Sequence, residues 1–370
     1  MRVLFLTQYG EQGSTSRTRV YQYLPHLRRA GVAYRVVIAS EDTLYRGALL
    51  RGQQPGWHHL PYLIASWLVT CVRSVEAVLR APRYDVVFVQ RVLPPLGLVW
   101  LLTRMNSRIV FDFDDALFEQ KHEAKGGCWD RLAGHRSARA LPDMLRVARW
   151  VIVENDHNRK YVLNHASNVA IITGPIDTDH YQPDHRMIGA SSQRGRVLGW
   201  IGSPGTTKYL HGIRGALSAL SERYGDLSLM LIGASPFEIR GMRVIQKPWG
   251  LDTEVENLRQ FDIGIMPLPD TPWTRGKGGY KLLQYMAMGI PAVASPVGIN
   301  REIIQDGVNG FLAASEKEWM EKLSLLIERP DLRRRFAEEG RRTVETRYSV
   351  RANFPRLLEI LNEVAHGGPS

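Results

Sequence analysis

Residues 267–298 read PLPDTPWTRGKGGYKLLQYMAMGIPAVASPVG, in which a strand end, a glycine-rich loop and an amphipathic helix follow one another. Leu282 and Met286 recur on one face of the expected helix, which is the spacing of a core-facing stripe. Gly289 and Pro291 then end it, since glycine caps helices and proline cannot continue them. The stretch therefore predicts a strand, a loop, a helix and a further strand from Pro291, the repeating unit of a parallel α/β sheet.

The loop before this helix combines glycines with positive charge. Bare amides at a helix start face a ligand, and the helix dipole favours an anion there. Lys277 and Lys281 share a helical face by their spacing. We therefore predict a site for a phosphate-bearing ligand, against the simpler alternative of a tight turn with solvated lysines. Its residues are Arg275, Gly276, Lys277, Gly278, Gly279 and Lys281.

Charge and length limit the function further. The chain has 370 residues, enough for about two domains, and a net charge of +11 with 44% hydrophobic residues. Such a charge suits an anionic partner: phosphates, an acidic membrane surface or nucleic acid. The arginines are scattered and no nucleic-acid-binding motif accompanies them, so we do not expect nucleic acid as a partner.

The expected location is cytoplasmic. Only Cys71 and Cys128 occur, without a CxxC pair, and the N-terminus does not read as a signal peptide. The apolar run from Leu60 to Leu79 is interrupted by Arg73 and Glu76, which argues against a membrane span. A peripheral contact with the inner face of the cytoplasmic membrane stays open, because this region carries the residue types found at lipid headgroups. They are Arg51, Trp57, Trp67 and Arg73.

Two series of alternating strands and helices predict the fold class, α/β with two Rossmann-like doubly wound domains. The polar, patternless stretch QPDHRMIGASSQRGR from Gln182 to Arg196 reads as the linker. We expect a first domain at 1–185, a linker at 186–196, a second domain at 197–346 and a terminal helical segment at 347–370. The expected strands lie at 2–7, 34–39, 84–90, 108–113, 150–153, 169–173, 197–201, 227–232, 243–246, 262–267 and 291–295. The helices expected between and after them include 17–29, 207–223, 280–288 and 316–328.

The first turn of the chain is a candidate ligand loop. Residues 9–19 read YGEQGSTSRTR, with glycines, hydroxyls and arginines between a strand and a helix. Open α/β sheets bind ligands at such turns. We assign Gly13 to the donor side of a site, and Ser16, Arg17 and Arg19 to an acceptor, against the alternative of a simple turn.

A second candidate, Asp112-Phe113-Asp114-Asp115, ends a strand at the same edge. A D-x-D pair suits a divalent metal, but no third ligand is near in sequence, so we favour hydrogen bonds to sugar hydroxyls and predict no metal. The following loop holds further metal-binding residue types without the spacing of a metal site, and they stay unassigned. They are His122, Cys128 and His135.

A third turn, 202–208 (GSPGTTK), again follows a strand and opens a helix. With Ser203 and Lys208 it forms a second phosphate cradle, unless Thr206 only caps the helix. In a doubly wound sheet this turn and the Gly276 loop lie at one carboxyl edge.

These stretches resemble the family 4 retaining glycosyltransferases. The resemblance rests on residues 172–179 (ITGPIDTD), 200–208, 262–298 and 298–310 (GINREIIQDGVNG), the last of which is similar to the signature G-x-x-E-[IV]-[IV]-x-D-G-x-x-G. It implies the GT-B fold, in which two Rossmann-like domains face each other across a cleft. It also implies a nucleotide-sugar donor in the second domain, an acceptor in the first, and a final helix that crosses back to the first domain.

The resemblance also implies residue roles. Lys208 matches the lysine that contacts the donor pyrophosphate, while Ser203 stands where the family has an arginine. The Glu-x7-Glu pair of the family falls on Gly276 and Gln284. Gln284 keeps the hydrogen-bonding reach of a ribose contact, so we expect Gln284→Glu to be tolerated, whereas the sugar contact from position 276 must come from Asp270, Lys277 or the main chain.

The predicted reaction is glycosyl transfer from a nucleotide-diphosphate sugar with retention of anomeric configuration. Basic groups would stabilise the departing diphosphate, with Lys208 and Lys277 as catalytic residues beside Asp112 and Asp114. No cofactor is expected besides the co-substrate, and the acceptor is a glycan, a lipid-linked or a small molecule. The main alternative is a non-catalytic partner subunit of the same shape. A dinucleotide-dependent oxidoreductase is disfavoured, because the first turn lacks G-x-G-x-x-G.

Overall fold

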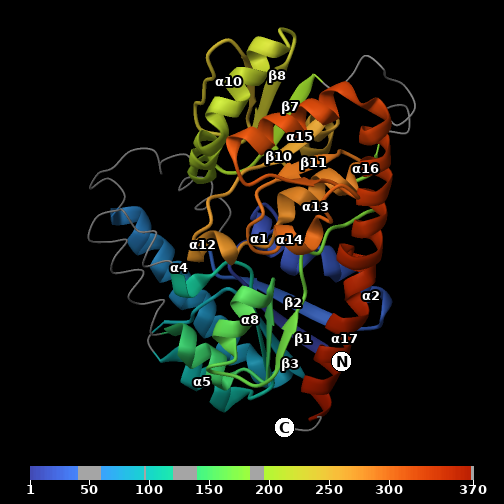
Figure 1. The fold of residues 1–370 in the computed structure, drawn as a ribbon. Coiled ribbons are helices and arrows are strands. Elements are labelled where there is room, and N and C mark those ends of the chain that lie inside the picture. The colour runs from blue at the N-terminus through green and yellow to red at the C-terminus, as the bar shows by residue number, and fades with distance from the viewer. Residues whose placement is uncertain (41–59, 96, 120–139, 184–195, 368–370) are drawn as a thin grey trace. The chain divides into compact units, whose positions relative to one another are not determined.

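A computed structural model describes residues 1–40, 60–95, 97–119, 140–183 and 196–367 (Figure 1). By their contacts the residues form two compact units. The first comprises Met1–Pro175, Gly276–Gly278 and Asn353–Ser370, and the second comprises Ile176–Arg275 and Gly279–Ala352. Each unit contains a six-stranded sheet whose strands all run parallel. The predicted doubly wound α/β architecture with two separate sheets is confirmed.

The sheet of the first unit has the strand order β2-β1-β3-β4-β5-β6. Its inner strands are apolar on both faces, as burial between two layers of helices requires. The strands are β1 (Arg2–Thr7), β2 (Ala33–Ile38), β3 (Val86–Gln90), β4 (Ile109–Phe113), β5 (Trp150–Val153) and β6 (Val169–Ile171).

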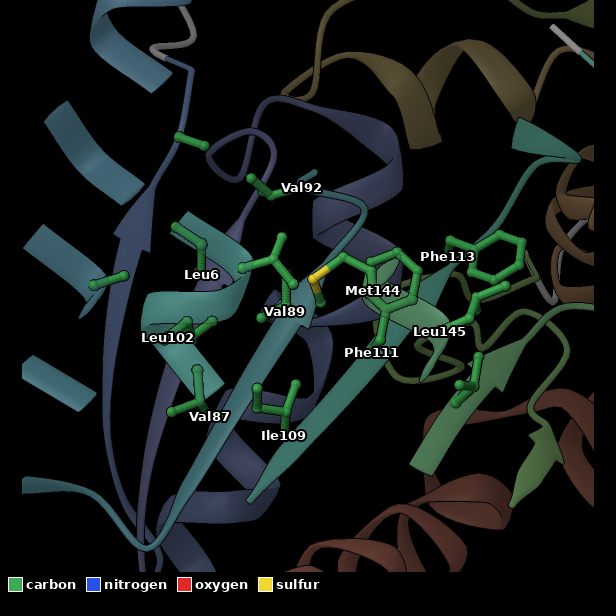
Figure 2. Close-up of a cluster of buried hydrophobic side chains, with 14 of the residues drawn as sticks. Leu6, Val87, Val89, Val92, Leu102, Ile109, Phe111, Phe113, Met144 and Leu145 are labelled. Carbon is green, nitrogen blue, oxygen red and sulfur yellow. The ribbon is translucent and has the colours of Figure 1, made fainter. Parts of the chain in front are cut away.

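One face of this sheet is covered by α4 (Leu60–Arg80), α5 (Leu98–Met105) and a helical stretch at 140–147. Figure 2 shows the cluster between them, where Val89 of β3 and Phe111 of β4 point toward Leu102 of α5 and toward Met144. These side chains are fully or almost fully buried. The alternation along each strand thus sends every second residue into this core.

The other face carries the helices at the two ends of the chain. They are α1 (Ser14–Arg19), α2 (Leu24–Arg29) and α17 (Val350–His366), of which residues 353–366 belong to this unit. Tyr23 and His26 contact the ring of Phe354, and Arg356 stacks on Trp150. The end of the chain therefore packs on the first unit. The unit also contains η1 (Tyr21–Tyr23), η3 (Ala81–Arg83), η4 (Leu117–Glu119) and α8 (Asp156–Val162).

The sheet of the second unit has the order β12-β11-β10-β7-β8-β9. Its strands are β7 (Val197–Ile201), β8 (Ser228–Ile232), β9 (Arg243–Lys247), β10 (Ile263–Met266), β11 (Ala292–Ala294) and β12 (Phe311–Leu312). Its helices are η5 (Pro204–Ile213), α10 (Arg214–Arg223), α11 (Glu254–Leu258), α12 (Pro272–Arg275), α13 (Tyr280–Ala287), α14 (Asn300–Ile303), α15 (Glu316–Glu328), α16 (Pro330–Thr343) and the π-helical turn η6 (Val344–Tyr348).

Two strand positions of this second sheet have room only for glycine, because aromatic rings pack directly against the backbone there. A Cβ on Gly199 of β7 would come within 1.9 Å of the Phe261 ring, and one on Gly264 of β10 within 2.4 Å of the Tyr285 ring. The Tyr285 hydroxyl in turn accepts a hydrogen bond from the amide of Ile201. Helix α13 is thereby pressed onto the centre of the sheet, which fixes where its first turn lies.

The structure departs from the expected elements in a few places. The helix expected at 17–29 is broken into α1, η1 and α2, and the one expected at 207–223 begins as the 3-10 segment η5. The first segment of the first unit runs to Pro175, whereas the sequence puts the domain boundary at 185. Of the expected linker 186–196, all but Arg196 lie outside the described residues.

Candidate functional site

The candidate donor site of the second unit lies at the carboxyl ends of β7 and β8 and the start of α13. The turn after β7 begins at Gly202, and the turn after β8 begins at Gly233, whose φ is +72°. A Cβ on Gly233 would stand 2.4 Å from the Gly202 carbonyl oxygen, so the two turns touch through backbone. Neither turn leaves room for a side chain at the contact.

Lys281, in the first turn of α13, reaches this point. Its Cε atom lies 2.9 Å from the Cβ position of Gly202, and its ammonium lies 5.2 Å from the centre of the Trp200 ring. The aliphatic stem is thus half-buried against glycine while the charge stays at the sheet edge. A cation at this edge, beside the amides of a helix start, is the arrangement expected for an anion site.

Ser203 and Lys208 lie on the turn after β7. Ser203 is the N-cap residue of η5, and its carbonyl accepts a hydrogen bond from the Thr206 hydroxyl at 2.9 Å. Lys208 is exposed, with its ammonium 5.4 Å from the centre of the Tyr209 ring. Both residues therefore follow the carboxyl end of β7, Ser203 just before η5 and Lys208 within it.

Gln284 lies one turn further along α13 and is only 4% exposed. Its Nε2 atom donates to Glu254 Oε1 at 3.0 Å and to the Tyr181 hydroxyl at 3.3 Å. Glu254, which begins α11, also accepts hydrogen bonds from the Tyr181 hydroxyl and from Trp249 Nε1. The amide of Gln284 is therefore held by a buried carboxylate.

Asp270 and Arg275 are paired with each other at the surface. Arg275 Nε donates to Asp270 Oδ1 at 2.6 Å, and its Nη2 donates to Oδ2 at 3.2 Å. The hydrogen bond from Arg275 lowers the pKa of Asp270. A ligand that binds either residue must replace this bidentate contact. The sequence analysis predicts both residues as contacts to the donor nucleotide-sugar and gives no sign that they are paired.

The segment Gly276–Gly278 packs with the first unit. Asn158 donates to the Gly276 carbonyl and Asn155 to that of Lys277, both at 3.1 Å, and Lys277 lies 3.8 Å from Asp115. A Cβ on Gly276 would come within 2.4 Å of the Ala116 Cβ, and within 2.8 Å of Asn158 Oδ1. The glutamate side chain that the resemblance would place at position 276 therefore has no room there. Gly279, with φ of +69°, caps α13 in the left-handed conformation.

A buried charge cluster stands at the carboxyl edge of the first sheet. The Arg19 guanidinium donates to both oxygens of Asp112, to Glu154 Oε1 at 3.0 Å, and to the carbonyls of Ile172 and Gly174. The exposed fractions are 2% for Arg19, 1% for Asp112 and 4% for Glu154. These side chains hold β4, β5 and α1 together, and their burial leaves them little surface for a substrate.

One cation cannot fully compensate two buried carboxylates. Burial raises the pKa of Asp112, against the opposing effect of the bidentate Arg19. Burial likewise raises the pKa of Glu154 to about 8, with Arg19 and the Gly174 amide opposing it. Glu154 is thus the carboxyl that holds a proton near neutral pH.

This proton predicts how stability depends on pH. From the ordinary Glu154 pKa of 4.5 up to about 8, the folded chain holds a proton that the unfolded chain releases. The free energy of unfolding should therefore fall as pH rises through this range. We expect Glu154→Gln to flatten the decline in melting temperature between about pH 5 and pH 8, and Glu11→Gln, at an exposed carboxylate of the same unit, to leave it as in the parent. Equal profiles for all three proteins would contradict the assignment.

Asp114 and Asp115 lie directly beside this cluster. Arg91 donates to Asp114, and to Asp115 at 3.2 Å, while the Thr15 hydroxyl donates to Asp114 at 2.5 Å. Burial favours the neutral form of Asp114, but Arg91 and Thr15 outweigh it and lower its pKa. Asp114 is therefore an anion whose remaining surface faces the edge of the sheet, where it is partly exposed.

The other predicted acceptor residues are buried as well. Ser16 donates to Gln90 Oε1 at 2.7 Å and accepts from the Tyr9 amide at 3.0 Å, and Arg17 is only 6% exposed. A Cβ on Gly13 would come within 2.4 Å of the Tyr9 Cβ, so this glycine permits a close turn. The first loop thus packs on itself and on β3.

No group of three or more His, Cys, Asp or Glu side chains suited to a metal ion occurs among the residues that the structure describes. The unassigned His122, Cys128 and His135 lie outside them, as do Arg51 and Trp57.

The sequence analysis missed residues that the structure places in contact with the predicted site residues. Arg91 and Glu154 each follow directly after a strand, β3 and β5, which is the same signal that identified Asp112 and Asp114. Applied to every strand, that rule finds them. Glu254 gives no such signal, because it lies on a short helix after a loop.

A comparison with known protein families finds a match that lies in the second unit. Residues 195–329 match the family model of glycosyl transferases group 1. No curated protein matches the chain by sequence.

Similar solved structures span the whole chain. HepE from Anabaena, in complex with UDP and glucose, has a TM-score of 0.67 at 17% identity and covers 98% of this chain and 99% of its own. Sucrose-phosphate synthase from Thermosynechococcus elongatus has a TM-score of 0.70 at 14% identity and covers 100% of both chains. A glycosyltransferase from Rickettsia africae has a TM-score of 0.64 at 14% identity, with 98% coverage of each.

The two Rossmann-like units and these neighbours give the chain the GT-B fold. The family match lies in the unit whose sheet edge carries Lys208, Lys281 and Gln284. The chain thus has the GT-B fold, and its residues 195–329 are similar to the glycosyl transferases group 1.

Proposed function

We propose that the protein transfers a sugar from a nucleotide-diphosphate sugar to an acceptor hydroxyl, with retention of anomeric configuration. The observation that carries the proposal is the turn after β7, where Lys281 of α13 packs against Gly202, with Lys208 in the following η5 and Gln284 on the next turn of α13. The family match over residues 195–329 covers all of these positions. HepE was solved with UDP and glucose, which favours the same class of donor here.

The chemistry asked of the chain is mainly electrostatic. As the bond between the anomeric carbon and the diphosphate oxygen breaks, Lys208 and Lys281 stabilise the charge on the leaving group. The acceptor oxygen forms the new bond, and its proton passes to the departing phosphate oxygen. Lys277 and Arg275 would join only after exchanging their carboxylate partners, Asp115 and Asp270. The reaction then requires no metal, no other cofactor and no protein nucleophile.

We assign the acceptor to the first unit. Asp114 and Asp115 are the partly exposed carboxylates of its edge and suit sugar hydroxyls, whereas Asp112, Ser16 and Arg19 hold the edge in place. The acceptor class we favour is lipid-linked, with the enzyme cytoplasmic and peripheral on the membrane.

Helices α4 and α5 (Figure 1) carry an exposed apolar surface that supports that choice, and we call it the α4–α5 surface. Along α4 its side chains recur every three or four residues, so they form one stripe. Arg104 stacks on Trp100 at 5.2 Å, an aromatic and cationic pair of the kind found at lipid headgroups. Within the described residues no helix is long and apolar enough to span a bilayer. The surface comprises Ile64 (50% exposed), Leu68 (50%), Val72 (65%), Val75 (42%), Leu79 (62%) and Trp100 (63%).

Vesicle binding tests the membrane contact. The purified protein should sediment with vesicles rich in phosphatidylglycerol and much less with neutral phosphatidylcholine, because apolar burial and arginine attraction act together. Val72→Glu should weaken binding at least about tenfold, since it places a charge in the apolar contact. The matched control is Leu325→Glu, at an exposed leucine of α15 in the second unit. Equal sedimentation of both variants, or concentration-dependent dimers without vesicle binding, would contradict a membrane role.

Transfer itself tests the proposed function. The chain alone, incubated with a labelled nucleotide-sugar and a membrane extract, should pass label to the extract, and should still do so in a chelator. Activity that is lost in chelator and restored by magnesium would overturn the metal-free mechanism. A protein that binds donor but transfers nothing would fit the non-catalytic partner subunit.

A further inference from the structure

A buried carboxylate, that of Glu254, contacts the side-chain amide of Gln284. The amide of Gln284 donates from Nε2 to Glu254 Oε1 at 3.0 Å. Glu254 is 1% exposed and also accepts from Trp249 Nε1 and the Tyr181 hydroxyl. The negative charge absent at position 284 is therefore present one side chain away, in a set of hydrogen bonds contained in the second unit.

This contact fixes the orientation of the Gln284 amide. A carboxylate only accepts hydrogen bonds, so the NH2 group must face Glu254 and the carbonyl must face away. Within the part of the chain that the structure describes, both hydrogen bonds of the Gln284 side chain are donated by Nε2, and its Oε1 accepts none. An oriented acceptor beside the anion site suits a hydroxyl of the nucleotide's ribose.

We propose that Glu254 is a positioning residue of the donor site: it orients Gln284, whose Oε1 then accepts from a ribose hydroxyl of the donor nucleotide. The inference rests on the proposed function, because the ligand is the same nucleotide. It goes beyond that function by assigning the negative charge and the ribose contact to two different residues. Glu254 holds the charge and Gln284 makes the contact.

The arrangement reverses the expectation that Gln284→Glu is tolerated. A glutamate at 284 would place a second carboxylate about 3 Å from that of Glu254, with both buried. One of the two must then take up a proton or turn away. At high pH, where both carboxylates would be ionised, the contact with Glu254 becomes repulsive and no longer orients the acceptor at position 284.

Exchanging the two residues should restore the pair. In Glu254→Gln/Gln284→Glu the amide and the carboxylate trade places, and the Tyr181 hydroxyl can donate to either position. The carboxylate at 284 is then oriented by the amide at position 254 and accepts from the ribose. A purely structural role for Glu254 predicts no such rescue of nucleotide binding.

The test measures the affinity for UDP and for other nucleoside diphosphates by calorimetry at about pH 8. Gln284→Glu should bind about ten- to a hundredfold more weakly than the parent, and the double variant should return to within a few-fold of the parent. The loss in the single variant should lessen as pH falls, since protonation removes the repulsion. Gln305→Glu, the same substitution at an exposed position of the same unit, should bind as the parent does.

The outcomes separate the two proposals. If the parent binds no nucleoside diphosphate, the proposed function fails. If the parent binds and Gln284→Glu binds equally well, or if the double variant is as weak as the single one, the positioning role of Glu254 is refuted. If Gln284→Glu does not fold, the folded double variant still decides, because the charge exchange predicts that it binds.

Discussion

Replacing Lys281 with alanine should reduce kcat/KM for the nucleotide-sugar by about 10²–10³-fold, the usual cost of removing one preorganised donor to a developing anion. The reason lies in its placement. The stem lies against Gly202, where any side chain would collide with it, and the ammonium lies 5.2 Å from the centre of the Trp200 ring, at the end of β7. Little of this lysine contributes to the core, so its loss should affect transfer far more than stability.

The measurement is steady-state kinetics together with thermal unfolding of the same preparations. Lys317→Ala is the matched control, because Lys317 lies on the exposed face of α15 in the same unit, 3.9 Å from Glu321. It should leave both activity and melting temperature near those of the parent. A Lys281→Ala protein with full activity, or one that loses activity only because it unfolds, would remove Lys281 from the site.

The second large effect concerns stability. Arg19→Met should lower the free energy of unfolding of the first unit by about 3–5 kcal/mol, because it leaves Asp112 buried without its cation and Glu154 without one of its hydrogen-bond donors. For a unit of this size the melting temperature should fall by roughly 10 °C. The methionine keeps much of the stem volume, so the missing charge and hydrogen bonds account for most of the effect.

Arg29→Met serves as the control, since Arg29 lies exposed at the end of α2 in the same unit. Its melting temperature should stay close to that of the parent. If Arg19→Met melts with it, the buried cluster does not hold the first sheet edge, and Arg19 returns to the candidates for direct acceptor contact.

The fold could be predicted because its signals are local. The strand at Arg2–Thr7 is a continuous apolar run, and the helix at Glu316–Glu328 has both an apolar period and a capping Ser315 that accepts from the Glu318 amide. Both have the bounds expected from the sequence. Helix α13 could be recognised for the same reason, with Gly279 before it and Gly289 after it.

The site could be predicted only in part, because it depends on contacts between distant segments. Lys281 was found from the glycine loop beside it, but nothing in the sequence indicates that Asp270 is paired with Arg275, or that Asp112 is enclosed by Arg19. The strongest example is Gln284, whose partner Glu254 lies 30 residues away. Gln284→Glu therefore conserves the size of the side chain but would place a second carboxylate beside that of Glu254.

The most direct test of the central claim is a screen of nucleoside diphosphates for thermal stabilisation of the purified chain. A nucleotide that binds the second unit should, at about a hundred times its dissociation constant, stabilise the protein by about 2.7 kcal/mol. The same nucleotide should give a much smaller shift with Lys281→Ala and an unchanged shift with Lys317→Ala. If no nucleoside diphosphate shifts the unfolding transition of the parent, or if Lys281→Ala responds as the parent does, the sheet edge after β7 is not a donor site.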